Sequence, residues 1–186
     1  MRFTEVPDIA GAWVIDHEMV EDDRGWFART FDRSEFERHG LATELLQASS
    51  SFNAAAGTLR GMHFQAEPHG ETKLIRCTRG RVFDVIVDVR VGSRGFGAWA
   101  GFELGPELAR SVYLPKGVAH GFVTMEAGSE LAYQMGEPYR PESSSGFRWN
   151  DPDVGIVWPV EPTVMSERDR SLPTLRDVAD AARSTT

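Results

Sequence analysis

The sequence is poor in cysteine, in net positive charge and in long apolar stretches, and each shortage excludes a class of protein. Its one cysteine, Cys77, cannot form an internal disulfide, so the fold does not depend on an oxidising compartment. No run of about 18 apolar residues occurs, so no membrane-spanning helix is predicted. Lys and Arg number 20 against 28 Asp and Glu, a formal net charge of −8. This balance argues against broad binding to nucleic acids or anionic membranes but permits a local arginine pocket for a small anion.

What the chain does have is the composition of a globular protein, with 41% hydrophobic and 26% charged residues. A length of 186 residues predicts one domain with a substantial core. Within that domain, 1–186, we expect N-terminal strands and a helix over 1–45, a barrel core over 46–136, and a C-terminal loop and helix over 137–186. The first residues lack a basic stretch followed by an apolar one, so we expect a cytoplasmic protein.

Short apolar runs separated by glycine and proline dominate the middle of the chain. The clearest is Arg81–Val89, where alternate residues fall on two faces with the period of a β-strand. Similar runs occupy residues 58–64, 72–77, 99–104, 111–114, 121–125 and 130–135. Strands at this spacing predict a sandwich, jelly roll or small barrel. Peripheral helices are predicted from Asp32 to His39, ending at Gly40, and over Leu175–Arg183.

Two histidines lie in strand-like segments with unusual neighbours. The first segment spans residues 59–65, where alternation places His63 on the same face as Gly61 and Gln65. The second segment spans residues 115–122 and contains His120. Taken alone, each is better explained as a hydrogen-bonded structural histidine. A barrel with inward histidines also raises the question of a metal, but the usual His-x-His pattern is absent because Gly61 and Gln65 flank His63. Metal binding is therefore disfavoured, although a His63/His120 pair stays open.

An acid–base pair is the alternative chemistry. An ammonium at Lys73 pointing into a barrel would stabilise a developing enolate or a phosphate, whereas an ordinary lysine would lie in solvent. Tyr133 shares a strand face with Leu131 and Met135, which fits either a core tyrosine or a proton donor.

These segments resemble the dTDP-4-dehydrorhamnose 3,5-epimerase family. The most specific strings are Leu59-Arg60-Gly61-Met62-His63-Phe64-Gln65 and Ala119-His120-Gly121-Phe122. Further matches lie at residues 23–27, 73–74, 82–90, 115–117, 149–152 and 166–169. The resemblance implies a cupin-like double-stranded β-helix, or jelly-roll barrel, that forms a homodimer by exchange of N-terminal strands. It also implies a nucleotide-diphosphate sugar as substrate, a place in rhamnose-type carbohydrate biosynthesis, and no metal or other cofactor.

The resemblance further implies a role for each matching residue. His63 matches the general base, Asp169 the carboxylate that orients it, Tyr133 the proton donor on the opposite face of the sugar, and Lys73 the group near the C4 oxygen. Substrate contacts are implied for the remaining candidates, Arg24, Arg29, Gln47, Ser49, Arg60, His120 and Tyr139.

Several of these recognition positions depart from the family's pattern. Arg29 stands where glutamate is common, Ala48-Ser49 where Asp-Asn is common, Glu71 where glutamine is usual, and Ser144 where glutamate often occurs. The acid–base set is intact, so epimerisation at C3 and C5 of a nucleotide-linked 4-keto-6-deoxysugar is the leading hypothesis. The alternatives are epimerisation at C3 alone, a sugar-nucleotide binding protein without turnover, and a metal-dependent cupin enzyme.

Overall fold

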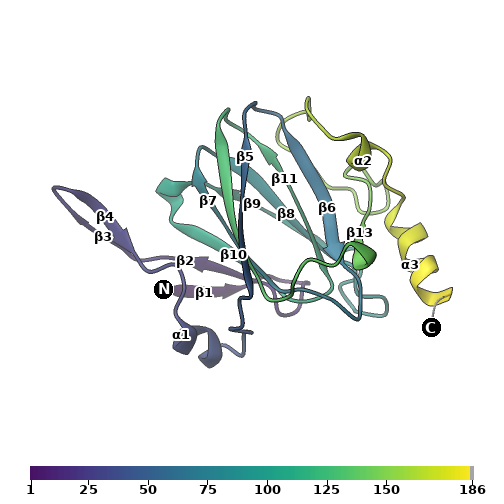
Figure 1. Ribbon diagram of the computed structural model, residues 1–186, viewed down its shortest axis with the longest axis horizontal. Helices are drawn as coiled ribbons and strands as arrows, with labels where there is room; N and C mark the ends of the chain where they lie inside the picture. The colour runs from purple at the N-terminus through teal and green to yellow at the C-terminus, as the bar shows by residue number, and fades with distance from the viewer. Residues whose placement is uncertain (185–186) are drawn as a thin grey trace.

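The protein, seen here as a computed structural model that describes residues 1–184, consists mainly of antiparallel β-strands (Figure 1). The six-stranded sheet has the order β1 (Arg2–Glu5), β2 (Trp13–Asp16), β10 (Arg110–Leu114), β7 (Lys73–Arg79), β12 (Ser129–Met135) and β5 (Gln47–Asn53). The five-stranded sheet has the order β13 (Ser144–Gly146), β6 (Leu59–Gln65), β11 (Val118–Thr124), β8 (Val82–Asp88) and β9 (Trp99–Leu104). The predicted mainly β fold is confirmed, and residues 185 and 186 of the predicted C-terminal segment lie outside the described residues.

The main core lies between the two sheets and follows from strand alternation. On β8, Val82 and Ile86 point into this core, whereas Val85 and Val87 point to the other side of the sheet. The predicted alternation over Arg81–Val89 is therefore correct, and both faces are buried. Each of the other apolar runs also forms a strand: the boundaries of the run over 99–104 are exact, and the others differ by up to three residues from those predicted.

Two smaller apolar clusters cover the outer faces of the sheets. Phe36, fully buried, packs helix α1 (Arg33–Arg38) against the six-stranded sheet. Leu175 packs α3 (Leu175–Ser184) against the outer face of the five-stranded sheet, with Met62 and Phe147 in the same cluster. Both predicted helices are present, and the Asp32 carboxylate caps α1 by accepting from two backbone N–H groups. The remaining short helices are η1 (Pro106–Leu108), η2 (Pro141–Ser143) and α2 (Glu167–Arg170).

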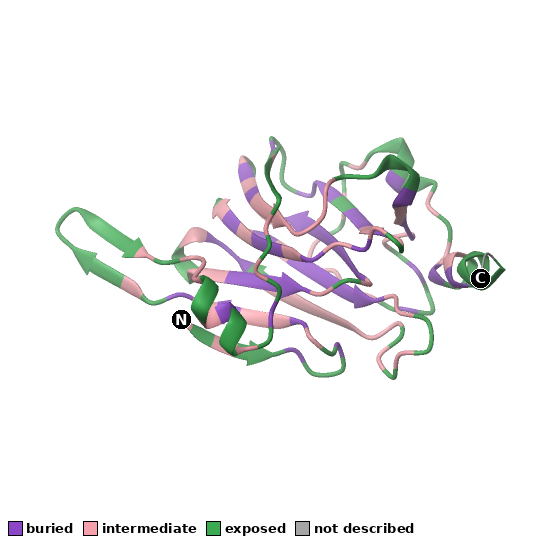
Figure 2. Cartoon of the chain, turned by 60° about the horizontal axis from the view of Figure 1, so that its bottom comes forward, coloured by how far each residue is buried: buried purple, intermediate pink, exposed green. Residues whose placement is uncertain are grey.

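A two-stranded hairpin projects from the body at the end away from α3 (Figure 1). It consists of β3 (Met19–Asp22) and β4 (Gly25–Ala28), and most of it is exposed, in contrast to the buried strands of the body (Figure 2). Val20 and Phe27 are 69% and 70% exposed, so the hairpin presents apolar side chains to its surroundings. Within residues 1–184, no helix has the length and apolar character needed to cross a membrane.

Candidate active site

A cavity of about 800 Å³ lies between the two sheets. Side chains of β5, β7 and β12 line it from one sheet, and side chains of β6 and β11 line it from the other. The segment that leads into α2 completes the wall. Nine of the eleven predicted site residues line this cavity, namely Gln47, Ser49, Arg60, His63, Lys73, His120, Tyr133, Tyr139 and Asp169.

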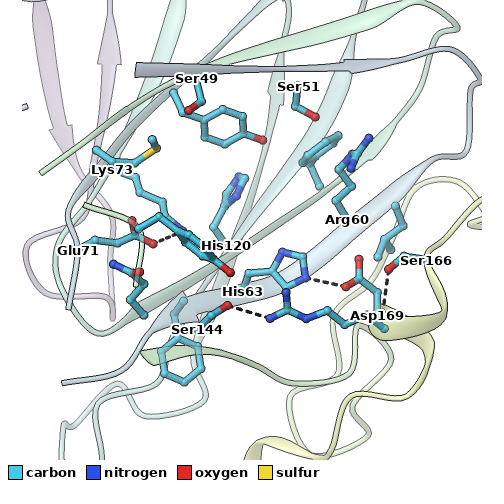
Figure 3. A pocket seen from close by; sticks show the side chains of 18 of the residues that line it. Ser49, Ser51, Arg60, His63, Glu71, Lys73, His120, Ser144, Ser166 and Asp169 are labelled. Carbon is cyan, nitrogen blue, oxygen red and sulfur yellow. Dashed lines mark hydrogen bonds and ion pairs between the residues drawn. The ribbon is translucent and has the colours of Figure 1, made fainter. Parts of the chain in front are cut away.

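His63 and Asp169 form a hydrogen-bonded pair at one side of the cavity (Figure 3). The His63 Nε2 atom lies 2.7 Å from Oδ1 of Asp169, and Asp169 is only 3% exposed. Ser166 caps α2 by accepting the Asp169 N–H at 3.1 Å, and the Gly61 N–H lies 3.4 Å from Oδ2. Burial alone would raise the pKa of Asp169, but the hydrogen bond and attraction of His63, aided by these N–H and hydroxyl groups, hold it below its usual value of 3.8. The carboxylate therefore stays ionised behind the imidazole.

A close approach of two glycines brings His63 into register with His120. A Cβ atom on Gly61 would lie 2.5 Å from the Gly121 Cα, and Gly61 has a φ of +144°, a region that L-residues avoid. The β6–β11 register shifts next to this contact, and His63 and His120 become direct cross-strand partners. Glycines 61 and 121 of the two predicted strings thus allow both histidines to face one cavity.

His120 forms a second imidazole–carboxylate pair, deeper in the protein. Its Nε2 lies 2.6 Å from Oδ2 of Asp84, a fully buried residue on the inner face of β8. The other carboxylate oxygen of Asp84 has no hydrogen-bond partner. Asp84 was not predicted as part of the site. The sequence did contain a signal for it, because Asp84 is a charged residue between Val82 and Ile86 on an otherwise apolar strand face.

Tyr133 enters the cavity from β12, on the sheet opposite the one that carries His63. Its ring packs edge-on against His120, with ring centroids 5.8 Å apart. Burial, with a further contribution from the Asp84 carboxylate, raises the pKa of the Tyr133 phenol well above its usual value of 10. The hydroxyl group is therefore protonated at neutral pH and can act as a proton donor.

Cationic side chains occupy the remaining walls. Lys73 Nζ lies 2.9 Å from Glu71 Oε1, and both side chains are 12% exposed (Figure 3). Arg60 donates to Asn53 Oδ1 at 2.9 Å, which fixes its guanidinium beside the cavity. Arg168, which precedes Asp169 and was not predicted from the sequence, also lines the cavity and donates to Ser144 at 2.8 Å.

Two predicted substrate contacts lie outside the cavity of their own chain. Arg24 is at the tip of the β3–β4 hairpin, 89% exposed and paired with Asp22. Arg29 follows the hairpin and pairs with Asp32 at 3.0 Å. One chain alone therefore does not bring these arginines to His63.

No group of three or more His, Cys, Asp or Glu side chains within residues 1–184 is arranged to hold a metal ion. Cys77 is buried, and burial raises the pKa of its thiol to about 11, as expected for an unreactive cysteine.

Comparisons with known proteins show which family the chain is similar to. The sequence profile of the dTDP-4-dehydrorhamnose 3,5-epimerase family matches residues 7–177. An enzyme of that name from Sinorhizobium fredii is 44% identical over 90% of this chain and 86% of its own length. A dTDP-4-dehydrorhamnose 3-epimerase from Streptomyces niveus is 37% identical over 93% of this chain and 84% of its own.

A solved structure extends the likeness to three dimensions. The 3,5-epimerase from Legionella pneumophila, crystallised with dTDP-4-keto-L-rhamnose, superposes with a TM-score of 0.87 at 33% identity, over 94% of this chain and 93% of that one. This similarity confirms the predicted cupin-like jelly-roll fold. The profile and the relatives each cover most of the chain, and so the chain belongs to the dTDP-4-dehydrorhamnose 3,5-epimerase family of isomerases.

Proposed function

We propose that the protein inverts C3 and C5 of a nucleotide-linked 4-keto-6-deoxysugar, converting dTDP-4-dehydro-6-deoxyglucose to dTDP-4-dehydrorhamnose. The observation that supports this proposal is that His63 and Tyr133, the proposed base and acid, line one cavity from opposite sheets. His63, backed by Asp169, lies on one side, and the protonated Tyr133 lies on the other. Inversion at carbon needs a proton removed from one face and another returned to the opposite face.

The first step is proton removal by His63. Because a carboxylate only accepts hydrogen bonds, the neutral ring carries its proton on Nε2 toward Asp169, which leaves the Nδ1 lone pair as the base. The ketone at C4 acidifies the hydrogens at C3 and C5, since the electron pair released from the C–H bond moves onto the C4 oxygen as an enolate. The ammonium of Lys73 stabilises that oxygen's negative charge.

The second step returns a proton from the other face. The enolate collapses to the ketone as carbon takes the proton of the Tyr133 hydroxyl, and the tyrosinate and the His63 imidazolium then exchange protons with solvent. The same two groups serve C3 and C5 in turn. Substrate and product are isomers, so the reaction requires no oxidant or reductant, and we propose that it uses no metal or other cofactor. Activity should accordingly survive dialysis against a chelator.

The nucleotide is proposed to lie along the cationic and polar wall of the cavity. Arg60 is placed to hold the diphosphate, because a guanidinium donates hydrogen bonds in the geometry that phosphate oxygens accept. Gln47, Ser49 and His120 offer polar contacts, and the half-exposed ring of Tyr139 offers a surface for the base.

We further propose a homodimer in which the β3–β4 hairpin of one protomer reaches the cavity of its partner. The hairpin projects from the body and exposes Val20 and Phe27, which a second copy would cover. This arrangement would bring Arg24 and Arg29 to the anionic substrate, although both lie outside the cavity of their own chain.

Solvent deuterium exchange tests the proposed reaction. The protein is incubated in D₂O with dTDP-4-keto-6-deoxyglucose, and label is followed by NMR at C3 and C5. Label at both carbons supports the 3,5-epimerase assignment, and His63→Ala should abolish it while the circular dichroism spectrum stays unchanged. Wild-type exchange in His63→Ala would show that the base is another group.

Epimerisation at C3 alone is the second candidate, and the Streptomyces niveus relative of that specificity favours it. Label confined to C3 would establish this alternative. No label at either carbon, in folded protein that binds dTDP, would instead support a sugar-nucleotide binding protein without turnover.

A further inference from the structure

The loop over residues 136–140 carries Tyr139 at the cavity, and one buried side chain holds this loop. Gln65, at the end of β6, is only 4% exposed. Its Oε1 accepts the N–H of Arg140 at 2.6 Å, and its Nε2 donates to the carbonyl of Pro138 at 3.3 Å and to that of His69 at 3.1 Å. The carboxamide therefore bonds to the residue on each side of Tyr139.

A second amide holds the same loop from the opposite sheet. The backbone N–H of Tyr139 itself donates to Oε1 of Gln47 on β5 at 3.0 Å. The backbone is thus fixed at three consecutive residues, 138–140, while Tyr139 is 58% exposed and lines the cavity. A fixed backbone beneath an exposed aromatic ring reduces the conformational entropy lost when a ligand stacks on that ring.

Only a carboxamide fits the position of Gln65. The three hydrogen bonds require one acceptor oxygen and two N–H donors. Glutamine supplies both kinds of group, whereas an ionised glutamate supplies only acceptors. With both ends of the amide committed to backbone partners, the side chain is occupied in holding the loop.

We infer that Gln65 is a positioning residue that presets the ring of Tyr139 to stack on the base of the nucleotide. This inference rests on the proposed function, because the base belongs to the proposed substrate. Gln65 acts on nucleotide affinity through Tyr139, and the acid–base step at His63 does not depend on it.

A double-mutant cycle measured with dTDP by calorimetry tests the inference. Gln65→Met keeps the length of the side chain and removes all three hydrogen bonds, and it should raise the Kd for dTDP about 10-fold, within the range expected for a lost base stack. In a Tyr139→Ala background, the same change should alter the Kd by less than about twofold, because the ring it positions is gone. The matched control is Gln134→Met, which makes the same substitution at a glutamine that does not line this cavity.

Kinetics provide a readout that general loosening of the fold would not reproduce. In Gln65→Met, KM should rise much more than kcat falls, since affinity is lost and the reacting groups are in place. Gln65→Asn, which keeps the carboxamide but shortens the side chain by one methylene, gives the same comparison if the methionine variant folds poorly.

Three outcomes would overturn the inference. An unchanged Kd in Gln65→Met, or an equal loss of affinity with and without the Tyr139 ring, would show that Gln65 does not act through Tyr139. Wild-type protein that does not bind dTDP would overturn the inference together with the nucleotide part of the proposed function, and that result is distinguishable from the first two.

Discussion

At the scale of single residues, two chemically identical pairs differ in what they can do. The imidazole of His63 is 36% exposed above a buried Asp169, so it can meet a substrate and exchange protons with solvent. The imidazole of His120 is 7% exposed against a fully buried Asp84, and its ring packs on Tyr133. Exposure thus favours His63 as the base and His120 as a group that shapes the wall around the proposed acid.

Removal of the Tyr133 hydroxyl should separate the two halves of the reaction. In Tyr133→Phe, His63 can still remove a proton and exchange it with solvent, but no donor stands on the opposite face. We expect deuterium exchange with retained configuration, and a fall in epimerised product of about 100-fold, typical for loss of an acid–base group. The measurement is NMR of label and configuration in the same sample.

Tyr113→Phe is the matched control for that experiment. Tyr113 is buried and its hydroxyl accepts the Ala42 N–H at 3.1 Å, outside the cavity. Its loss should lower stability and leave the product ratio unchanged. Equal inversion in Tyr133→Phe and wild type would assign the donor to another group.

We expect the Glu71 carboxylate to weaken binding of the proposed anionic ligand, because it lies inside the cavity and offsets the positive charge of the Lys73 ammonium. The Glu71 carboxylate, 2.9 Å from the ammonium, cancels part of the positive charge that an anionic substrate meets. Glu71→Gln keeps an acceptor for Lys73 and removes that negative charge, so the Kd for dTDP should fall about 3- to 10-fold. Calorimetry at fixed ionic strength measures the change.

A neighbouring glutamate provides the control. Glu67→Gln changes the net charge by the same amount outside the cavity. It should leave the Kd within about twofold, because charges in solvent are screened. Tighter binding in both variants would indicate a long-range effect of net charge, and weaker binding in Glu71→Gln would show that its carboxylate contacts the ligand.

At the scale of elements, alternation predicted the strands well, because β8 and its neighbours bury one face in each of two cores. Pairing between distant strands was not readable in the same way. Asp84 meets His120 only because β8 pairs with β11 in one register, and no local pattern specifies that register. Helix α2 spans only Glu167–Arg170, too short for a periodic signal, and so Asp169 was identified through the family resemblance alone.

Asp16 joins three strands and predicts a pH-dependent contribution to stability. From β2 it accepts from Arg2 on β1 at 2.7 Å and from Arg110 on β10 at 2.8 Å. Partial burial opposes ionisation, but both arginines outweigh it and hold the pKa of Asp16 below its usual 3.8. The folded state thus binds the proton less readily than the unfolded state, so the stabilisation is complete above pH 3.8 and is lost as pH falls through the lower folded pKa.

Asp16→Asn should therefore reduce the free energy of unfolding by about 1 kcal/mol at pH 7, a modest loss because the pair is partly exposed. In urea denaturation, the stabilities of variant and wild type should converge as the pH falls below 3.8. Asp153→Asn, which removes a pair that is more exposed, serves as the control. A difference that persists undiminished at low pH would show that the ionised carboxylate is not its source.

At the scale of the whole molecule, the projecting hairpin (Figure 1) is the feature that favours the proposed homodimer. The body carries His63, Tyr133 and Asp169 in one chain, whereas Arg24 projects away from that chain's own cavity. A net charge of −8 makes a local cationic wall necessary for an anionic substrate. A partner's hairpin at each cavity would add Arg24 and Arg29 to the arginines that each chain already has there, with a two-fold relation between the sites.

Subunit complementation decides whether the site is shared. Homodimers of Arg24→Ala and of His63→Ala should each be defective, one in substrate binding and the other in proton removal. In a purified heterodimer, one cavity combines both defects, while the other has the intact His63 of one chain and the intact Arg24 hairpin of the other. Deuterium exchange should recover to about half of the wild-type rate per dimer, since one of two symmetric sites is restored. No recovery would mean that Arg24 acts at the cavity of its own chain. A heterodimer of His63→Ala with Asp169→Asn should show no recovery of deuterium exchange, whether or not the site is shared, because His63 and Asp169 pair within one chain.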